Sequence, residues 1–438
     1  MSDPSDPARP LAVPSGRLNR LGKISTMTAG IAGNMALSGI AQLGQGQRPK
    51  MRDLLLTPSN ITRVADQLAQ MRGAAMKIGQ LISMDTGDLL PPELSQIMAR
   101  LRNDAHFMPP AQLKQVLNAG WPKDWLRAFE NFDVHPIAAA SIGQVHRAKL
   151  KDGRDMAIKV QYPGIAKSID SDVANVGALL RMSGLLPKGF ELAPYLEQAR
   201  AQLHDETDYA REGAQLAKFH TLLTDAPEFE IPDLYEDWST PNILAMRYLD
   251  GISIEETPTK DRNQVVSDLI DLTLRELFEF GLMQTDPNFA NYLYNAQSHK
   301  IVLLDFGAAR ALDPIIVESY RCLMKAGLVG DMDDLRKITA EIGFIDSDTK
   351  EHHRERILSM ISRTFQAFAQ TEIFDFAQND LSRQMQLEGT ELAEDGFIPP
   401  PLPIDVLLLQ RKLGGIFLLA SQLKAQVNVA ERMGKYLL

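Results

Sequence analysis

The sequence predicts an α+β protein in which a small antiparallel sheet, interrupted by a long helical insertion, precedes a mostly helical lobe. Three observations lead to this prediction. Short apolar or alternating segments gather between residues 140 and 248, and helical spacing of apolar residues dominates before and after them. The chain has 438 residues, 45% hydrophobic and 23% charged, which is enough for a sizeable core in two or three domains or in one unit with two lobes.

Composition excludes several classes of protein. The proportions are ordinary for a globular chain, so a wholly disordered protein, a collagen and a disulfide scaffold are ruled out. The net charge is −10, and no cluster of Lys and Arg with interleaved aromatic residues stands out against it, so no nucleic-acid partner is expected. The single cysteine, Cys322, cannot form an intramolecular disulfide, which favours a reducing, cytoplasmic compartment.

Residues 1–50 are the first of four expected segments. They lack the basic and apolar regions of a secretory signal. Ile24–Gly44 is uncharged but interrupted by polar residues, and three interpretations remain open: a soluble helix packed on a partner, an interfacial membrane helix and a membrane span. Basic residues flank it and favour an anionic surface such as the inner face of the plasma membrane. The flanking residues are Arg17, Arg20, Lys23, Arg48, Lys50 and Arg52.

Residues 51–125 are expected to form a helical extension, because their apolar residues recur at helical spacing. Residues 126–249 are expected to contain the sheet and its insertion. Lys151-Asp152-Gly153 predicts a hairpin turn between the first two strands, and Ile165–Leu223 predicts the helical insertion between the second and third. The expected strands are Ala140–Leu150, Arg154–Val160, Ile231–Tyr235 and Asn242–Tyr248.

Residues 250–438 are expected to form the mostly helical lobe. The apolar pattern predicts a helix over Arg262–Phe280, and then one short strand over Ile301–Leu304. From Asp313 to Leu438 the chain is expected to be helical apart from the Pro-rich loop Pro399–Pro403.

The clearest chemical signal lies in this last segment. Asp286 is followed by Asn291, and an apolar strand then ends in Asp305-Phe306-Gly307. Kinase-type phosphoryl transfer uses this arrangement: the first Asp is catalytic and orients the nucleophile, while the Asn and the second Asp hold Mg²⁺ on the nucleotide phosphates. Magnesium prefers such oxygen ligands. Two unrelated surface turns are the alternative, but their order and spacing favour a phosphoryl-transfer site.

A lysine for the phosphates is expected upstream. Lys159 stands in a Met-Ala-Ile-Lys-Val context on the second strand of the hairpin, where it can bind the α and β phosphates. Its acidic partner is expected in the helical insertion, where the dense acidic cluster offers three candidates. These are Glu206, Asp208 and Glu212, and a solvated helix face is the alternative for each.

The phosphate loop departs from that of a conventional kinase. Ala138, Ala139 and Ala140 stand where glycines are expected, followed by Ser141, so the loop offers backbone N–H groups and one hydroxyl but less backbone freedom. No Ala-Pro-Glu sequence follows Asp305 closely, which removes the platform on which a protein substrate docks. A conventional protein kinase is therefore not expected.

These motifs resemble the UbiB family, the aarF-domain-containing atypical kinases associated with ubiquinone biosynthesis. The resemblance covers about residues 60 to 430. It rests on Lys77-Ile78-Gly79-Gln80, which is similar to the family's K-x-G-Q signature, and on the Ala-rich loop. Glu206-Thr207-Asp208 is similar to its E-x-D motif, and Gln284–Asn291 to the catalytic loop of its mitochondrial and some bacterial members.

The resemblance implies roles that spacing does not show. The K-x-G-Q helix would cover the cleft, with Lys77 and Gln80, which share a helix face, directed at the nucleotide; without the family they would be read as solvated. Glu206 would be the partner of Lys159, with Glu212 in reserve. A hinge would bind the adenine edge through its backbone, and it comprises Met246, Arg247, Tyr248 and Leu249.

The function implied is a protein-kinase-like bilobal fold that binds Mg²⁺ with ATP or ADP and turns ATP over slowly, in support of ubiquinone biosynthesis at a membrane surface. The alternatives are a phosphotransferase for a small molecule or lipid, and a nucleotide-gated lipid-binding module with negligible chemistry. Quinone-pathway lipids, biosynthetic proteins and a second copy of the chain, as a homodimer, are the expected partners.

Overall fold

The computed structural model describes residues 68, 71–86, 97, 107–140, 142–183, 186, 190–378 and 380–437. The chain divides into two compact units. The first contains the described residues up to Ala214 and Asp233–Tyr248, and the second contains Gln215–Pro232 and the chain from Leu249 onward. Residues 1–50, with Ile24–Gly44, lie outside the described residues, so their interpretation stays a prediction.

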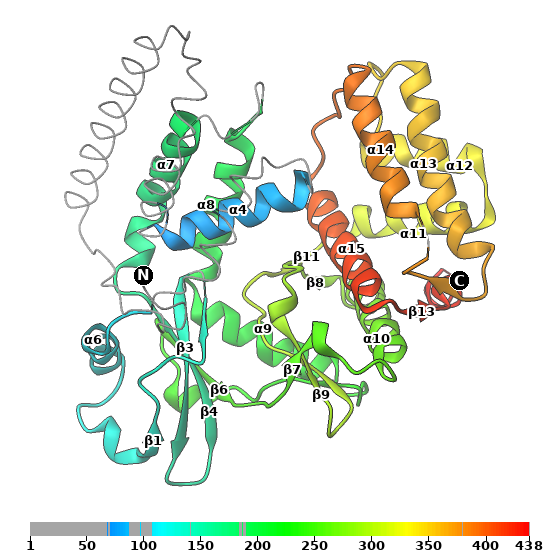
Figure 1. Cartoon of the computed structure of the whole chain (residues 1–438). Coiled ribbons are helices and arrows are strands. Elements are labelled where there is room, and N and C mark those ends of the chain that lie inside the picture. Colours follow the sequence, from blue (N-terminus) through cyan, green and yellow to red (C-terminus); the bar gives the residue numbers. More distant parts are fainter. Residues whose placement is uncertain are drawn as a thin grey trace, which may run out of the picture. The chain divides into compact units, whose positions relative to one another are not determined.

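The first unit is built on an antiparallel sheet with the strand order β1-β3-β4-β6, and β2 pairs with β3 (Figure 1). The predicted hairpin is confirmed, because β3 and β4 pair along their length and Gly153 supplies the turn with a φ of +96°. Buried Met156, Ile158 and Val160 of β4 join an aromatic cluster. The strands are β1 (Phe129–Phe132), β2 (Ala138–Ala139), β3 (Gly143–Leu150), β4 (Asp155–Gln161) and β6 (Ile243–Arg247).

The predicted insertion is helical, and its described residues form three helices. These are α7 (Ile165–Ser183), α8 (Ala193–Glu206) and α9 (Tyr209–Leu222), which contains the boundary between the two units. Helix α4 (Arg72–Thr86) packs against α7 and α8 (Figure 1). It buries one apolar face there, including Ile78 and Ile82, because these residues recur at helical spacing. A further helix, α6 (Pro110–Gly120), precedes the sheet.

The second unit contains more strands than the sequence predicts. Its larger sheet has the order β5-β10-β9-β7, and β8 pairs separately with β11. The strand expected at 231–235 does not form as a regular strand: Pro232 has no N–H for a ladder, and an isolated antiparallel bridge joins Leu234 to Met246. The strands are β5 (Phe229–Glu230), β7 (Ile252–Ser253), β8 (Leu282–Gln284), β9 (Tyr292–Asn295), β10 (Lys300–Leu303) and β11 (Ala309–Ala311).

The expected helix over 262–280 is confirmed in its first part, α10 (Arg262–Arg275). It then widens into a π-helical turn, Glu276–Phe280, and ends at Gly281, whose φ is +55°. The expectation of helix alone after Asp313 is wrong at one point, because the two-residue strands β12 (Phe374–Asp375) and β13 (Gln426–Val427) pair with each other.

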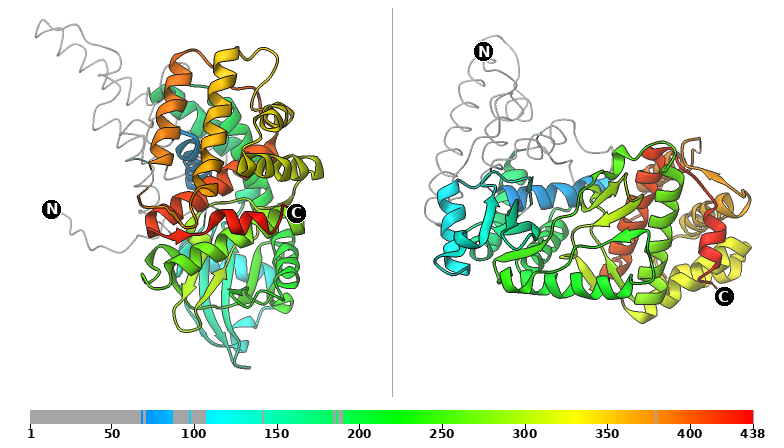
Figure 2. Two further views of the ribbon diagram at one scale, coloured as in Figure 1. Left: turned by 90° about the vertical axis from the view of Figure 1, so that its right-hand side faces the viewer. Right: turned by 90° about the horizontal axis from the view of Figure 1, so that it is seen from below.

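Six helices follow in the described part of the second unit. Helices α13 and α14 run side by side, and α15 packs against α10 (Figures 1 and 2). Asp313 and Asp331 cap the first turns of α11 and α12 with their side chains. The helices are α11 (Pro314–Val329), α12 (Met332–Ile342), α13 (Glu351–Ala369), α14 (Leu381–Glu394), α15 (Ile404–Leu423) and α16 (Val429–Gly434).

Among the described residues, none of the helices combines the length and the apolar character that crossing a membrane requires.

Candidate functional site

Asp286 and Asn291 lie together in the second unit, in the loop between β8 and β9. The Asn291 amide nitrogen donates to Asp286 Oδ2 over 3.3 Å. Asn288 makes two hydrogen bonds that turn this loop back. Its backbone N–H donates to Asp286 Oδ1, and its side-chain Oδ1 accepts from the Ala290 N–H, which caps the short 3₁₀ turn Phe289–Asn291. Five residues of separation therefore bring the expected catalytic carboxylate and the expected metal ligand into contact.

Asp305 follows the buried strand β10 in the same unit. The Leu304 N–H donates to the Asn291 carbonyl over 3.0 Å, which ties the end of β10 to the catalytic loop. Asp305 Oδ1 accepts from the Gly307 N–H over 2.9 Å. Phe306 is buried and its ring centroid lies 4.8 Å from that of Phe219. The aspartate is thus held at the strand end, as the sequence predicts, by its own turn and by an aromatic anchor.

These residues provide the donors that Mg²⁺ requires. The Asn291 nitrogen is engaged as a donor to Asp286, so its amide oxygen is the atom that can ligate a metal. Together with the Asp305 carboxylate it supplies hard oxygen ligands, and no nitrogen or sulfur ligand is needed. The donor set fits a magnesium ion held mainly by phosphate oxygens and completed by an amide and a carboxylate.

Lys159 lies on β4 of the first unit and forms a buried ion pair with Glu212 of α9. Its Nζ donates to Glu212 Oε1 and Oε2 over 2.8 and 2.9 Å. The ring of Tyr209 lies below the ammonium group, with the centroid 5.3 Å from Nζ, where a cation–π contact stabilises the charge. The lysine is therefore held in a fixed position on the strand.

The expected pairing of Lys159 with Glu206 is wrong, and the reserve candidate Glu212 takes that place. Glu206 is the last residue of α8 and pairs with Lys77 of α4 over 2.7 Å. The chain breaks between α8 and α9, where Asp208 caps the new helix by accepting from the Arg211 N–H. This break turns Glu206 toward α4 and places Glu212 in the first turn of α9, a distinction that residue spacing alone does not reveal.

Lys77 is buried on α4, the helix that the family resemblance expects to cover the nucleotide cleft. Its side chain is only 6% exposed, and its ion pair links α4 to the end of α8. Gln80 lies one turn further along α4, and its side chain lies outside the described ones. Whether these two residues face the nucleotide stays a prediction.

The Ala-rich loop is a tight hairpin rather than an open loop. Ala138 and Ala139 form β2, and the Ala140 N–H donates to the Gly143 carbonyl over 2.9 Å. Ser141 lies outside the described residues. A Cβ added to Gly143 would lie 2.5 Å from the Val160 carbonyl oxygen, closer than real Cβ atoms come. Gly143 is therefore required because the backbone of β4 lies too close for a side chain.

The expected hinge, Met246–Leu249, spans the chain's passage between the two units, whose boundary falls after Tyr248. Met246 pairs with Ala157 across β6 and β4. Arg247 forms an ion pair with Asp233 over 2.9 Å, and the Tyr248 N–H donates to the Asp155 carbonyl. The strand is thus fixed up to its last residue, and adenine binding by its backbone stays a prediction.

Sequence reasoning missed a buried cation beneath the catalytic loop. Lys412 of α15 donates to the Gln284 carbonyl over 2.9 Å and to the Tyr292 hydroxyl over 2.8 Å, and it pairs with Glu276 over 3.3 Å. Gln284 precedes the loop and Tyr292 follows it, so one ammonium group holds both ends. A sequence signal existed, because a lysine inside the apolar pattern of α15 requires buried acceptors.

The ammonium and the carboxylate of this group are coupled. Burial opposes the charge on Lys412, but Glu276 and Tyr292 more than offset it, so the pKa of Lys412 lies above its ordinary value. Burial raises the pKa of Glu276, against the opposing attraction of Lys412. Since the Gln284 carbonyl, the Tyr292 hydroxyl and the Glu276 carboxylate all offer oxygen acceptors to the Lys412 Nζ, we assign Lys412 as charged and Glu276 as its counter-ion.

A second missed network lies next to the Ala-rich loop. The Met108 N–H donates to Gln144 Oε1 over 2.8 Å, which orients the amide so that Gln144 Nε2 donates to His146 Nε2 over 2.8 Å. His146 therefore carries its proton on Nδ1 and donates it to the Asp133 carbonyl. Burial lowers the pKa of His146, so the neutral imidazole is the form that the fold favours.

Known proteins resemble the whole chain. Residues 100–339 match the ABC1 atypical kinase-like domain family. The mitochondrial atypical kinase COQ8 of Saccharomyces cerevisiae is 36% identical over 433 residues, which cover 97% of this chain and 86% of the yeast protein. The mitochondrial atypical kinase COQ8B of Rattus norvegicus is 37% identical over 432 residues, which cover 97% of this chain and 81% of the rat protein.

A solved structure supports the fold. The Rv3197–erythromycin complex from Mycobacterium tuberculosis is 22% identical and superimposes with a TM-score of 0.59 over 84% of this chain and 93% of that one. The predicted α+β, protein-kinase-like fold is confirmed. The family match and the identity to the COQ8 proteins also confirm the resemblance to the UbiB kinases. The chain therefore belongs to the ABC1 family of atypical kinase-like proteins.

Proposed function

We propose that this protein binds Mg²⁺ with ATP or ADP and hydrolyses ATP slowly. Asp286 orients the attacking water or acceptor hydroxyl and takes up its proton, while Asn291 and Asp305 hold the magnesium ion. Lys159, held by Glu212, binds the nucleotide phosphates, and the backbone of the Ala-rich loop and the segment 246–249 complete the nucleotide contacts. When bound by these residues, Mg²⁺ would supply the positive charge that offsets the charge developing on the phosphate oxygens.

The contact between Asp286 and Asn291 is the observation that carries this proposal. A loop that served only as a turn would not need a carboxylate and an amide in contact, with Lys412 fixing both of its ends. The buried pair of Lys159 and Glu212 supports it independently, because a buried lysine without a task would cost stability.

Phosphate release from purified protein tests the proposal, with Asp286→Asn as the control. The wild type is expected to release phosphate from ATP in the presence of Mg²⁺, and the variant to release it at least tenfold more slowly, because positioned proton transfer contributes on the order of 10²–10⁴-fold. Equal release by both proteins would contradict the catalytic assignment. Transfer of label to an added lipid would instead support a phosphotransferase.

The metal ligands are tested separately. Asp305→Asn is expected to remove the Mg²⁺ dependence of nucleotide binding while the fold remains, because one anionic ligand is lost. The shift of the melting temperature with nucleotide, titrated with and without Mg²⁺, measures this. An unchanged magnesium dependence would show that Asp305 is not a ligand.

We further propose that this activity supports quinone-lipid biosynthesis at a membrane, with pathway lipids or enzymes as partners. The motifs and the similarity to COQ8 proteins support this proposal. The relatives are mitochondrial by name, which gives no support to the plasma-membrane location expected from the sequence. Stimulation of phosphate release by vesicles that contain a quinone precursor, and none by vesicles without it, is the expected result.

A further inference from the structure

Two adjacent histidines and one aspartate converge in the second unit, and none of them belongs to the nucleotide site proposed above. His352 and His353 belong to the first turn of α13, and Asp395 follows the last turn of α14. Each histidine places its Nε2 atom 3.0 Å from the same atom, Asp395 Oδ2. All three candidate ligand atoms lie within 4.8 Å of one another.

We propose that His352, His353 and Asp395 form a binding site for a zinc-class divalent cation. Two imidazole nitrogens and one carboxylate oxygen are the donors of many three-residue zinc sites, in which water occupies the fourth position. Imidazole is a poor ligand for Mg²⁺, which takes oxygen. The site is therefore chemically distinct from the proposed magnesium ligands Asn291 and Asp305.

The distances are close to those that a bound ion requires. Zinc bonds of about 2.0–2.1 Å in tetrahedral geometry separate neighbouring ligand atoms by about 3.3 Å. The two Nε2–Oδ2 separations of 3.0 Å differ from this value by a few tenths of an ångström. The ring centroids of the two histidines lie 4.1 Å apart, so the two rings lie next to each other.

The ligands come from positions that neighbouring contacts fix. His353 is 2% exposed and its ring meets that of Phe397 edge-on. His352 and Asp395 are exposed, which leaves an open side for entry of the ion and for water as a further ligand. A rigid, buried imidazole combined with an open face is the arrangement that a metal site needs.

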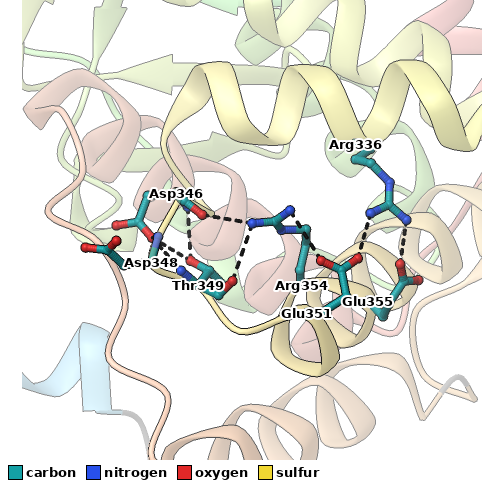
Figure 3. A network of polar contacts seen from close by, with 7 residues as sticks. All are labelled: Arg336, Asp346, Asp348, Thr349, Glu351, Arg354 and Glu355. Atoms are coloured by element: carbon teal, nitrogen blue, oxygen red, sulfur yellow. Dashed lines mark hydrogen bonds and ion pairs between the residues drawn. The ribbon is translucent and has the colours of Figure 1, made fainter.

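Contacts that involve no histidine position the first turn of α13 (Figure 3). Arg336 of α12 pairs with Glu351 over 3.0 Å. Arg354 donates to the Asp346 carbonyl over 3.1 Å, and Asp346 Oδ1 accepts from the Thr349 N–H and hydroxyl, each over 2.8 Å. The turn before α13 is therefore ordered without metal, and binding would require little rearrangement.

Charges on the facing helix are compatible with a cation. Arg354 directly follows His353 and pairs with Glu351, and Arg356 pairs with Glu391 of α14. Further along the two helices, Arg363 pairs with Glu388. The ion would extend this series of links between α13 and α14 to the ends of the helices.

Zinc titration of the full-length chain tests the proposal. Chelator-treated protein is expected to bind one Zn²⁺ per chain by calorimetry, and Zn²⁺ is expected to raise its melting temperature. His352→Ala removes the exposed ligand without opening the core, and it should weaken binding at least about tenfold, as the loss of a first ligand exceeds the 10–100-fold cost typical of outer-shell changes. Co²⁺ should give a visible absorption band in the wild type and none in the variant.

His220→Ala removes an exposed histidine elsewhere on the second unit and is the matched control. It should retain wild-type zinc affinity, and Asp395→Asn should lose it in the same way as His352→Ala. Binding that survives His352→Ala, or a wild type that shows no saturable binding, would overturn the proposal and leave a hydrogen-bonded cluster. Neither result affects the proposed nucleotide function, because Asp286 and Asp305 are intact in every variant.

Discussion

In the phosphate loop of the first unit, the glycine is required by close packing, and alanines occupy the positions where a conventional kinase has flexible glycines. Gly143 is required because the Val160 carbonyl oxygen occupies the space that a Cβ would need. Ala139 stands in β2, where its Cβ is accommodated and restricts the backbone. The loop is therefore restrained at the position where a conventional kinase loop is free.

Gly143→Ala and Ala139→Gly should have opposite kinds of effect. The first should lower the free energy of unfolding by about 1–3 kcal/mol through overpacking. The second should cost about 1 kcal/mol at most in backbone entropy, but it should alter the ratio of the ATP and ADP dissociation constants by freeing the loop. Urea unfolding and nucleotide titration of both variants measure these effects. An unchanged nucleotide ratio and no incorporation of label in Ala139→Gly would mean that the loop is not a restraint.

His146 predicts a pH dependence of stability. Burial holds its pKa below the ordinary value, so the neutral form is favoured in the fold and the unfolded chain binds more protons as the pH falls. The stability that the neutral His146 contributes is fully present above the pKa of the unfolded chain, about 6.5. It is lost as the pH falls from that value toward the lower pKa of the folded protein. The melting temperature should therefore fall between about pH 7.5 and about pH 5.5.

Replacing the histidine isolates this effect. His146→Gln should lower stability at neutral pH and flatten the decline toward acid, because the titrating group is gone. His220→Gln, at an exposed position in the second unit, should retain the full decline. An identical pH profile in wild type and His146→Gln would contradict the assignment.

At the scale of elements, α15 is the support of the catalytic loop. Lys412 binds the residues on both sides of the loop, and a Cβ on Gly415 would lie 2.6 Å from the Cβ of Pro287 within it. The helix therefore touches the loop at its two ends and in its middle. Any displacement of α15 would be transmitted to Asp286, one residue before Pro287.

Lys412→Met should be severely destabilising, by about 3–5 kcal/mol, because it leaves the Glu276 carboxylate buried without a counter-ion. The double variant Lys412→Met, Glu276→Gln should recover most of this loss, since no buried charge remains. It should nevertheless keep a reduced rate of phosphate release, because the Gln284 carbonyl and the Tyr292 hydroxyl lose their common donor. A double variant with wild-type activity would show that the network stabilises the fold without positioning the loop.

The sequence predicts elements well where the signal is local. The hairpin of β3 and β4 follows from alternation and a Lys-Asp-Gly turn, and Asp286, Asn291 and Asp305 follow from spacing along a short stretch. The two-residue strand β5 was missed because its parallel partner β10 lies far along the chain, and so short a segment carries no period of its own. Glu212 and Lys412 depend on how helices end and pack, which no local pattern contains.

At the scale of the whole molecule, charge is distributed unevenly along the chain. The net charge is −10, yet residues 1–50 contain six Lys and Arg against two Asp. The rest of the chain is therefore the acidic part, which an anionic lipid surface repels. Any attraction to such a surface should reside in the first segment.

Removal of residues 1–50 should reduce binding to anionic liposomes while nucleotide affinity stays unchanged. Co-sedimentation of the full-length and shortened chains measures the first quantity, and nucleotide titration the second. Raising the salt concentration should weaken binding of the full-length chain, because the attraction of basic residues to the surface is screened. Equal sedimentation of both chains would place the membrane contact elsewhere.

Lys412 lies beyond the segment that matches the family, yet the matched segment needs it for a complete interior. The family match ends at residue 339, and α15 begins at Ile404. A protein produced from the matched residues alone would contain every proposed catalytic and magnesium-binding group of the second unit. It would also expose the apolar face of α10 that α15 covers, and Glu276 would lack its cation. Fragments prepared for biochemical work should therefore extend through α16, because the helices that follow the recognised domain complete its interior.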